Sequence, residues 1–256
     1  MKAAFALKTT FRSPFSFALN TLRQWRSPDV KVFLIGFNKC GTKAFHRLLN
    51  RNGVRSAHYS PDGKNLAREI EERLPDNTAL KAFLDQWTAY SDLSYLSKDK
   101  LIEGNRHFRL YHELFPKAYF ILNDRDVEAW LLSRKNQGHP NGFLSHSMHA
   151  MNCGADRTIQ IWRETHADHV AQVTNYFQGS PRFLHYRIDR DPIADVISFL
   201  SPSFSISERH WQVVNRTKRE PEGANKPGLP TQSGAFSGMG SRVVRMTKMA
   251  LNNSCG

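Results

Sequence analysis

The stretch VFLIGFNKCGTKAF, residues 32–45, joins a run of apolar residues to a loop between two glycines and then to a helix start. Val32 to Ile35 predicts a short buried strand, and the apolar spacing from Phe45 to Leu49 predicts one face of a helix that ends near Asn52. A glycine-rich turn between a strand and a helix directs backbone N–H groups and the positive end of the helix dipole at one point. The stretch therefore predicts a phosphate-binding loop.

The position of the lysine in this loop is unusual. In the common form Gly-x4-Gly-Lys-Ser/Thr the lysine follows the second glycine, whereas here Thr42 follows Gly41 and the loop lysine is Lys39. We expect Gly36 to reverse the chain, Gly41 to allow close approach of a ligand, and Lys43 to stand at the helix start. Taken alone, a glycine-bounded turn after a strand is equally compatible with a purely structural role.

A second stretch, YFILNDRDVEAWLLSR at residues 119–134, strengthens the prediction of an anion site. A buried strand runs out into Arg125, and Ser133 follows on the next helix. An arginine at the carboxyl end of a parallel strand faces the crevice where α/β sheets bind ligands, and a nearby serine can reach the same anion. The alternative is a surface ion pair of Arg125 with Asp126 or Glu128.

The order of the remaining patterns predicts the fold class. Further helices are predicted at 66–74, 79–87, 108–116, 127–137, 157–177 and 194–200, with strands at 118–123 and 183–188. Residues 89–105 have an irregular or strand-like pattern, and residues 138–156 have the composition of a mobile loop that covers an active site. Alternating strands and helices predict an α/β fold: a single three-layer domain with a central parallel sheet and a P-loop-like nucleotide site.

The charge of the chain lies mostly in its ends. The formal net charge is +13, and residues 1–28 hold Lys and Arg side chains but no acid. Residues 221–256 are rich in Gly and Pro and again basic. We therefore expect a basic N-terminal extension (1–28), an α/β domain (29–220) and a flexible basic tail (221–256). Because the central part is nearly balanced in charge, we expect no specific nucleic-acid partner.

The sequence also limits the cellular context. No apolar stretch approaches the roughly 18 residues that cross a bilayer, so we expect a cytoplasmic protein. Residues 1–28 suit a transit peptide, an amphipathic segment in peripheral contact with a membrane, or a disordered extension. Cys40, Cys153 and Cys255 form no close pair, which favours a reducing compartment. We interpret Cys40 as a small residue that fills a tight turn.

Together the two stretches resemble the sulfotransferase family that uses 3′-phosphoadenosine-5′-phosphosulfate, in its bacterial-type or carbohydrate-type branch. The phosphosulfate loop of that family has the form Pro-Lys-Ser-Gly-Thr-Thr, and Asn38-Lys39-Cys40-Gly41-Thr42-Lys43 stands in its place. The family's 3′-phosphate motif, an arginine after a buried strand and a serine eight residues later, is matched by Arg125 and Ser133. The segment ERHWQVVNRTKRE, which includes Lys218, is similar to a late His-Val-Asn-Arg/Lys-Thr segment of the family. The similarity spans about residues 31–220.

The resemblance implies how the loop acts. Lys39 would contact the phosphosulfate bridge and neutralise the charge left as the sulfuryl group departs, and no metal is expected. The cofactor-binding residues implied by the two motifs and the late segment are Gly36, Asn38, Lys39, Cys40, Gly41, Thr42, Lys43, Arg125, Ser133 and Lys218. Three positions depart from the family pattern: Cys40 replaces a serine that restrains the lysine, Lys43 a threonine and Asn38 a proline.

The acceptor, a hydroxyl-bearing small molecule or glycan, needs a base within hydrogen-bond reach. The sequence offers Asp92, Glu103 and His107 as candidates for this base, and we prefer Asp92. The alternative is that Asp92 caps the start of a turn. His139, His146, His149 and Cys153 match no compact zinc pattern. We expect His166 and His169, three residues apart on the long helix, to be surface residues or to pack against a neighbouring element. The sequence does not give the oligomeric state.

Two other functions remain open at this stage. A small-molecule kinase with a phosphate loop would need magnesium and a carboxylate that closes a strand, for which Asp124 or Asp126 would have to serve. A basic module that binds nucleic acid or an anionic membrane would rely on the charged ends of the chain. Dependence on magnesium would identify the first, and binding that collapses with salt would identify the second.

Overall fold

The computed structural model describes residues 30–138, 140 and 142–212. A five-stranded parallel sheet forms the centre of this part, in the order β2-β3-β1-β6-β7. The strands are β1 (Val32–Leu34), β2 (Ser56–His58), β3 (Ala89–Ser91), β6 (Tyr119–Asp124) and β7 (Phe183–Arg187). A short antiparallel pair, β4 (Ser94–Leu96) and β5 (Leu101–Glu103), leaves the sheet after β3. The predicted α/β fold with a central parallel sheet is confirmed.

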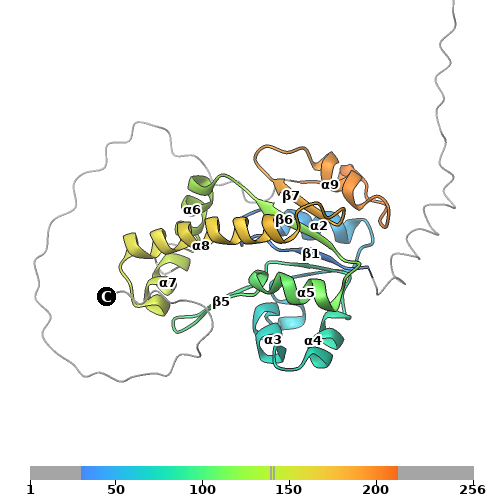
Figure 1. The fold of residues 1–256 in the computed structure, drawn as a ribbon. Helices are drawn as coiled ribbons and strands as arrows, with labels where there is room; N and C mark the ends of the chain where they lie inside the picture. The colour runs from blue at the N-terminus through green and yellow to red at the C-terminus, as the bar shows by residue number, and fades with distance from the viewer. Residues whose placement is uncertain (1–29, 139, 141, 213–256) are drawn as a thin grey trace, which may run out of the picture. The chain divides into compact units, whose positions relative to one another are not determined.

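Helices cover both faces of the sheet (Figure 1). One face packs against α2 (Thr42–Arg51) and α9 (Ile193–Leu200). The other packs against α3 (Leu66–Arg73), α4 (Asn77–Leu84), α5 (Phe108–Leu114) and the end of α8 (Ala155–Tyr176). The helices α6 (Val127–Lys135) and α7 (Phe143–Met151) pack with the first half of α8 around a smaller apolar cluster of their own. Short 3₁₀ turns lie at Pro61–Gly63, Gly104–His107 and Glu208–His210.

The central strand shows why this sequence forms a doubly covered sheet. Val32 and Leu34 contact the α2 and α9 side, whereas Phe33 and Ile35 contact the opposite side, and all four are fully buried. A parallel strand that is buried on both faces reads as a continuous apolar run rather than as an alternation. The run from Val32 to Ile35 therefore occupies the middle of the sheet.

The strand order fixes where a ligand can bind. The chain leaves β1 toward β3 and β2 on one side and later returns to place β6 on the other side of β1. In such sheets the crevice outside the carboxyl ends of these neighbouring strands is the usual ligand site. The glycine loop follows β1, and Arg125 follows β6, so both motifs lie at this crevice.

The structure differs from the predicted elements in several places. The strands β2 and β3, each of three residues, were not predicted as members of the sheet. The helix α4 ends at Leu84 rather than at Trp87 because Asp85 caps it and the chain then turns into β3. The segment 138–156, predicted as a mobile loop, contains α7 and the start of α8. Among the described residues, no helix combines the length and apolar character needed to cross a membrane.

Candidate active site

Side chains of β6 and α6 hold the glycine loop from behind. Asn123 accepts a hydrogen bond from the Gly36 amide at 3.0 Å and donates from Nδ2 to the Cys40 carbonyl at 3.0 Å. Arg125 Nη1 donates to the Lys39 carbonyl at 3.2 Å, and Trp130 Nε1 donates to the Asn38 carbonyl at 3.0 Å. These bonds turn three successive carbonyls toward β6 and α6. The loop is thus held against β6, Arg125 and α6 through three carbonyls and the Gly36 amide, in a turn of the kind that can cradle an anion.

Close packing explains both glycines of the loop. A Cβ on Gly36 would lie 1.8 Å from the Asn123 carbonyl oxygen, and a Cβ on Gly41 would lie 2.0 Å from Ile188 Cδ1. Gly41 also has a φ of 76°, the left-handed conformation that precedes the first turn of α2. No larger residue fits at either position without displacement of its neighbours.

The loop and Arg125 form a half-buried cationic site. Burial lowers the pKa of Lys39, the charge of Asp92 opposes that shift, and the charge of Arg125 adds to it. Arg125 Nε and Asn38 Oδ1 are buried and have no hydrogen-bond partner among the described residues. Buried polar atoms usually have a hydrogen-bond partner, and at this loop a bound ligand could supply one. The chemistry of this site therefore suits an anion at the start of α2.

The other predicted loop residues are also placed by the structure. Cys40 is buried, and burial raises the pKa of its thiol well above the ordinary value. This is consistent with a small residue that fills a turn. Ser133 is buried in α6, the helix that follows Arg125. Lys218 lies outside the described residues, as do the predicted domain boundaries at 28/29 and 220/221.

A cavity of about 500 Å³ adjoins the loop. Its walls come from the loop and α2, from the ends of β2 and β3, and from the segment around the start of α7. The residues that line it include Asn38, Lys43, His58, Tyr59, Asp92 and Phe143. Its size is within the usual range for small-molecule sites. The cavity brings Asp92 to the same place as the predicted phosphate loop.

Three residues around this site have strained backbones. Lys39, Tyr59 and Asp92 have φ values of 68°, 56° and 56°, and they follow β1, β2 and β3 respectively. Non-glycine residues in this conformation cost about 1–3 kcal/mol each and cluster at functional sites. The strain thus lies at the carboxyl ends of three neighbouring strands, where the cavity is.

Asp92 is held by hydroxyl groups. Its Oδ1 accepts a hydrogen bond from Ser94 Oγ at 2.6 Å, and its Oδ2 accepts one from Thr42 Oγ1 at 3.4 Å. His58 Nδ1 lies 4.0 Å from the same Oδ2. Thr42, predicted as a donor-binding residue, therefore links the phosphate loop to the carboxylate that we prefer on the acceptor side.

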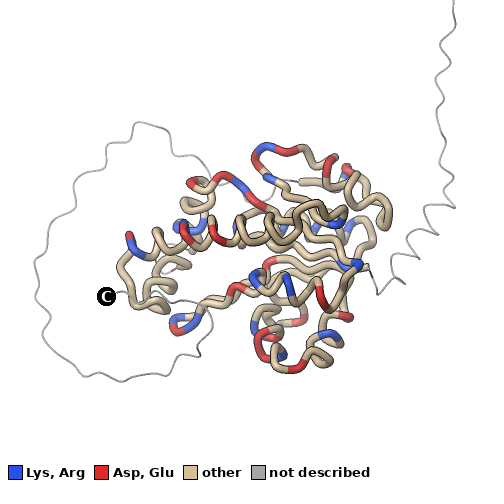
Figure 2. The backbone as a smooth tube through the Cα atoms, viewed as in Figure 1, with Lys and Arg blue, Asp and Glu red and all other residues tan. Residues whose placement is uncertain are grey.

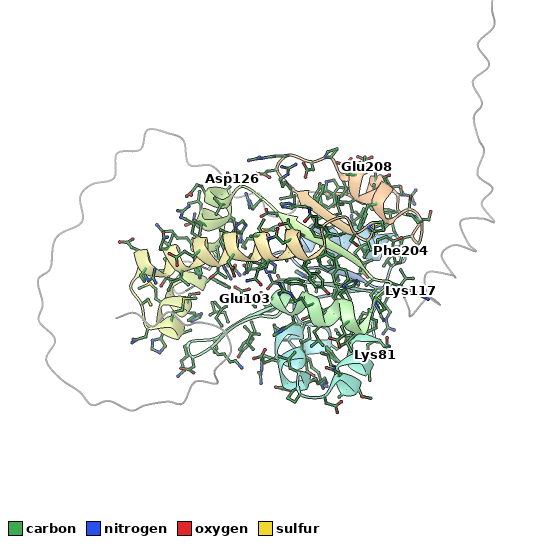
Figure 3. All side chains as sticks on the ribbon, viewed as in Figure 1. Lys81, Glu103, Lys117, Asp126, Phe204 and Glu208 are labelled. Atoms are coloured by element: carbon green, nitrogen blue, oxygen red, sulfur yellow. The ribbon has the colours of Figure 1, made fainter. Side chains whose placement is uncertain are left out.

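The two alternative bases lie elsewhere. Glu103, at the end of β5 (Figure 3), forms a buried ion pair with Arg134 of α6. The Arg134 guanidinium also lies against the rings of Phe143 and Trp162. His107 faces Glu71 of α3 at 3.5 Å. Neither Glu103 nor His107 lines the cavity.

Several histidines have roles that the sequence did not reveal. His166 and His169 of α8 are buried, so of the two roles that the sequence left open the structure supports helix packing. His166 Nε2 is 2.8 Å from Asp124 Oδ1, and His185 Nε2 is 3.0 Å from Asp124 Oδ2. His169 Nε2 is 2.7 Å from the Ile35 carbonyl. For His166 and His169 the sequence signal is that polar residues recur on the inward face of a long amphipathic helix, whereas His185 lies in β7 and has no such signal.

No group of three His, Cys, Asp or Glu side chains in the part of the chain that the structure describes is arranged to hold a metal ion. His146 lines the cavity, and His139 lies outside the described residues.

The fold and the site define an α/β protein with a glycine-bounded loop between a strand and a helix, beside a cavity of ligand size. A family model described as a sulfotransferase domain matches residues 31–201. Because this match covers more than half of the 256 residues, the chain belongs to the sulfotransferase family, and its domain is that of a transferase. Comparison with curated proteins gives no significant match.

Proposed function

We propose that this protein transfers a sulfuryl group from 3′-phosphoadenosine-5′-phosphosulfate to a hydroxyl group of a polar acceptor such as a carbohydrate. The observation that carries the proposal is the cavity of about 500 Å³, whose walls include both the loop residues Asn38 and Lys43 and the carboxylate Asp92. A donor on the loop and an acceptor in the cavity would thus be neighbours. Membership of the sulfotransferase family supports the same reaction.

The residues at the loop suit the donor. Arg125 Nε, which has no hydrogen-bond partner in the described part of the chain, offers a buried N–H to a phosphate. The tight packing of Gly41 keeps the start of α2 free of a side chain. We assign the loop from Gly36 to Lys43 to the 5′-phosphosulfate, and Arg125 with Ser133 to the 3′-phosphate. Lys218 would add a further phosphate contact. When bound, the donor supplies the activated sulfuryl group.

Lys39 would act on the leaving group. Negative charge develops on the bridging oxygen as the bond from sulfur to that oxygen breaks. A cation held in advance at such a position lowers a barrier by roughly 2.7 to 4 kcal/mol, by analogy with single oxyanion donors. The left-handed backbone of Lys39 and the hydrogen bond from Arg125 to its carbonyl fix the start of its side chain.

The cavity favours a polar acceptor with one flat surface. Most of the residues around it carry hydroxyl, amide or ionisable groups, and the Tyr59 residue is 45% exposed. Polar groups fix the orientation of a ligand, whereas an aromatic ring supplies contact area. A sugar ring, with hydroxyl groups at its edge and an apolar face, satisfies both requirements.

Calorimetric titration with adenosine 3′,5′-bisphosphate in the presence of a chelator tests the donor site. We expect wild type to bind it with a Kd on the order of micromolar, and Arg125→Ala to weaken binding at least about tenfold through loss of a charge-assisted hydrogen bond. Arg187→Ala is the matched control, because Arg187 ends the neighbouring strand β7 but pairs with Asp191. Binding of ATP with magnesium alone would contradict the proposal.

The carboxyl end of β6 supports a kinase less well than a sulfotransferase. A kinase would use a carboxylate there to hold magnesium. Asp124 already accepts hydrogen bonds from His166, His185 and the Arg125 amide. Its lone pairs are thus committed to the protein, which leaves little capacity for a metal.

A further inference from the structure

We propose that His58 is the general base of the reaction and that the carboxylate of Asp92 stabilises its charged form. This inference rests on the proposed function, since it names the group that takes the proton of the acceptor hydroxyl. His58 ends β2, lines the cavity together with Asp92, and has a side chain that is 17% exposed.

The hydrogen bonds around His58 select one tautomer. Its Nδ1 lies 3.4 Å from Ser91 Oγ and 4.0 Å from Asp92 Oδ2. Ser91 Oγ donates its single proton to the Ala57 carbonyl at 3.3 Å, so it can only accept from the imidazole. The nearby carboxylate also favours a proton on Nδ1. The proton therefore resides on Nδ1, and Nε2 keeps the lone pair that a base needs.

Asp92 is less suited to take the proton itself. Both of its oxygens accept hydrogen bonds from hydroxyl groups, those of Ser94 and Thr42. Its charge faces His58 at 4.0 Å and also acts on Lys39. A carboxylate at this distance stabilises through its charge the imidazolium that forms during the reaction.

The charged and titratable groups around His58 keep it neutral before the reaction. Burial lowers the pKa of His58, Asp92 partly opposes this shift, and Lys43 of α2 adds to it. The ring of His46, also in α2, lies 5.3 Å from that of His58, and burial lowers the pKa of His46 to about 4. On the remaining side Tyr59 follows directly in the chain, and burial raises the pKa of its phenol. At neutral pH His58 is thus an unprotonated imidazole.

The transfer breaks one bond at sulfur and forms another. The acceptor oxygen forms a bond to sulfur while the bond between sulfur and the bridging oxygen of the donor breaks. The acceptor proton moves to His58 Nε2. The electron pair of the broken bond leaves with adenosine 3′,5′-bisphosphate, whose new charge faces Lys39. The imidazolium returns its proton to solvent.

The test compares His58→Gln and Asp92→Asn with His46→Gln, in the full chain and with p-nitrophenyl glycosides as acceptors. His46 is the matched control, because it is a half-buried histidine beside His58 that does not line the cavity. We expect His58→Gln to lower kcat by about 10²–10⁴-fold without weakening the binding of adenosine 3′,5′-bisphosphate. We expect His46→Gln to stay within about threefold of wild type, since general-base effects are far larger.

The pH profile separates catalysis from a structural role. In wild type the acid limb of kcat/KM should rise with pH through the pKa of His58, and His58→Gln should lose this limb. Asp92→Asn should move the limb to lower pH, because Asp92 raises the pKa of His58. Nitrogen NMR of the imidazole should show the proton on Nδ1 in wild type.

Failure of the inference about His58 can be distinguished from failure of the proposed function. A wild type that transfers sulfuryl groups, together with an equally active His58→Gln variant or an unchanged acid limb, would overturn this inference and leave the proposed function intact. A wild type that binds no adenosine 3′,5′-bisphosphate and forms no sulfated product would overturn both. A proton found on Nε2 of His58 would also overturn the inference.

Discussion

Gly41 is the residue on which the loop conformation depends most directly. Two effects oppose a side chain there: the positive φ and the contact of a Cβ with Ile188 Cδ1 at 2.0 Å. Gly63 offers a matched control, because its φ is +78° but nothing lies within 4 Å of its Cβ position. The two glycines therefore separate backbone strain from overpacking.

We expect Gly41→Ala to destabilise the protein by about 2–5 kcal/mol, as the sum of left-handed strain and overpacking. Gly63→Ala should cost only the strain, about 1–2 kcal/mol. Urea unfolding measures both values, and titration with adenosine 3′,5′-bisphosphate should show weaker binding for Gly41→Ala alone. Equal destabilisation by the two variants would show that Ile188 moves aside without cost.

Lys39 gives the reaction an alkaline limit. The lysine is cationic below its pKa, and burial holds that pKa below the ordinary lysine value. As pH rises through it, the charge that stabilises the leaving group disappears, so kcat should fall at a lower pH than an unburied lysine would impose.

Two substitutions test whether the charge of Lys39 sets the alkaline limb. Lys39→Ala should lower kcat by about 10²–10³-fold at neutral pH. Lys39→Arg should be slower than wild type because of its shape, but its alkaline limb should vanish, since a guanidinium stays protonated. An alkaline limb that persists in Lys39→Arg would assign it to another group.

At the scale of the elements, α8 and β7 converge on Asp124 at the end of β6. Burial alone would raise the pKa of Asp124, but hydrogen bonds from His166 and His185 lower it below its ordinary value. A carboxylate with a lowered folded-state pKa contributes stability that is fully present above the unfolded value near 3.8. That contribution is lost as the pH falls further toward the folded-state pKa.

We expect Asp124→Asn to cost about 1–3 kcal/mol at neutral pH, because a neutral amide satisfies the buried donors less well. Below about pH 4 the gap between wild type and variant should narrow progressively, since the unfolded chain then binds a proton that the folded carboxylate of Asp124 does not. Urea unfolding across pH measures this, with the exposed Asp99→Asn as control. A gap that stays constant into acid would exclude the carboxylate as the source of the stability.

The same elements show what the sequence could and could not predict. The strands β1 and β6 were predictable because each is a continuous apolar run. The strands β2 and β3 have three residues each and include serine and histidine, so a pattern of period two is too short to detect. Pairing with β1, through Val32 with Ala89, and with β2, through Ala57 with Tyr90, fixes β3 in the sheet.

Which site residues could be predicted from the sequence depends on which strands could be predicted. Lys39 and Arg125 were found because each belongs to a local motif beside a recognisable strand. His58 lies in a polar stretch without a motif, and its place beside Asp92 exists only because β2 pairs with β3. Three-dimensional neighbours that come from separate short strands leave no signal in sequence spacing.

At the scale of the whole molecule, charge is divided between the domain and the ends of the chain. Figure 2 shows Lys and Arg interspersed with Asp and Glu over the described residues. The excess of +13 is concentrated outside them, in sequence segments such as 1–28 that hold basic residues and no acid. Mixed charge gives a weak field at distance, whereas a cluster of one sign attracts anionic surfaces in a manner that salt screens.

This division predicts that two kinds of binding can be separated by truncation. A chain of residues 29–220 should bind adenosine 3′,5′-bisphosphate as tightly as the full chain does. Its binding to vesicles with anionic lipid should fall by at least about tenfold at low salt, because each basic residue near such a surface contributes about 1 kcal/mol. Co-sedimentation over a series of salt concentrations measures the second effect.

A shorter chain that ends at residue 212 tests whether the segment with Lys218 belongs to the nucleotide site. If Lys218 contacts a phosphate, this truncation should weaken nucleotide binding by at least about tenfold, and Lys218→Ala in the 29–220 chain should reproduce part of that loss. Arg216→Ala is a control of equal charge in the same segment. Equal effects of the two substitutions would indicate a general field of positive charge rather than a specific contact. Vesicle binding that survives removal of both ends would place the anionic-surface site on the α/β domain itself.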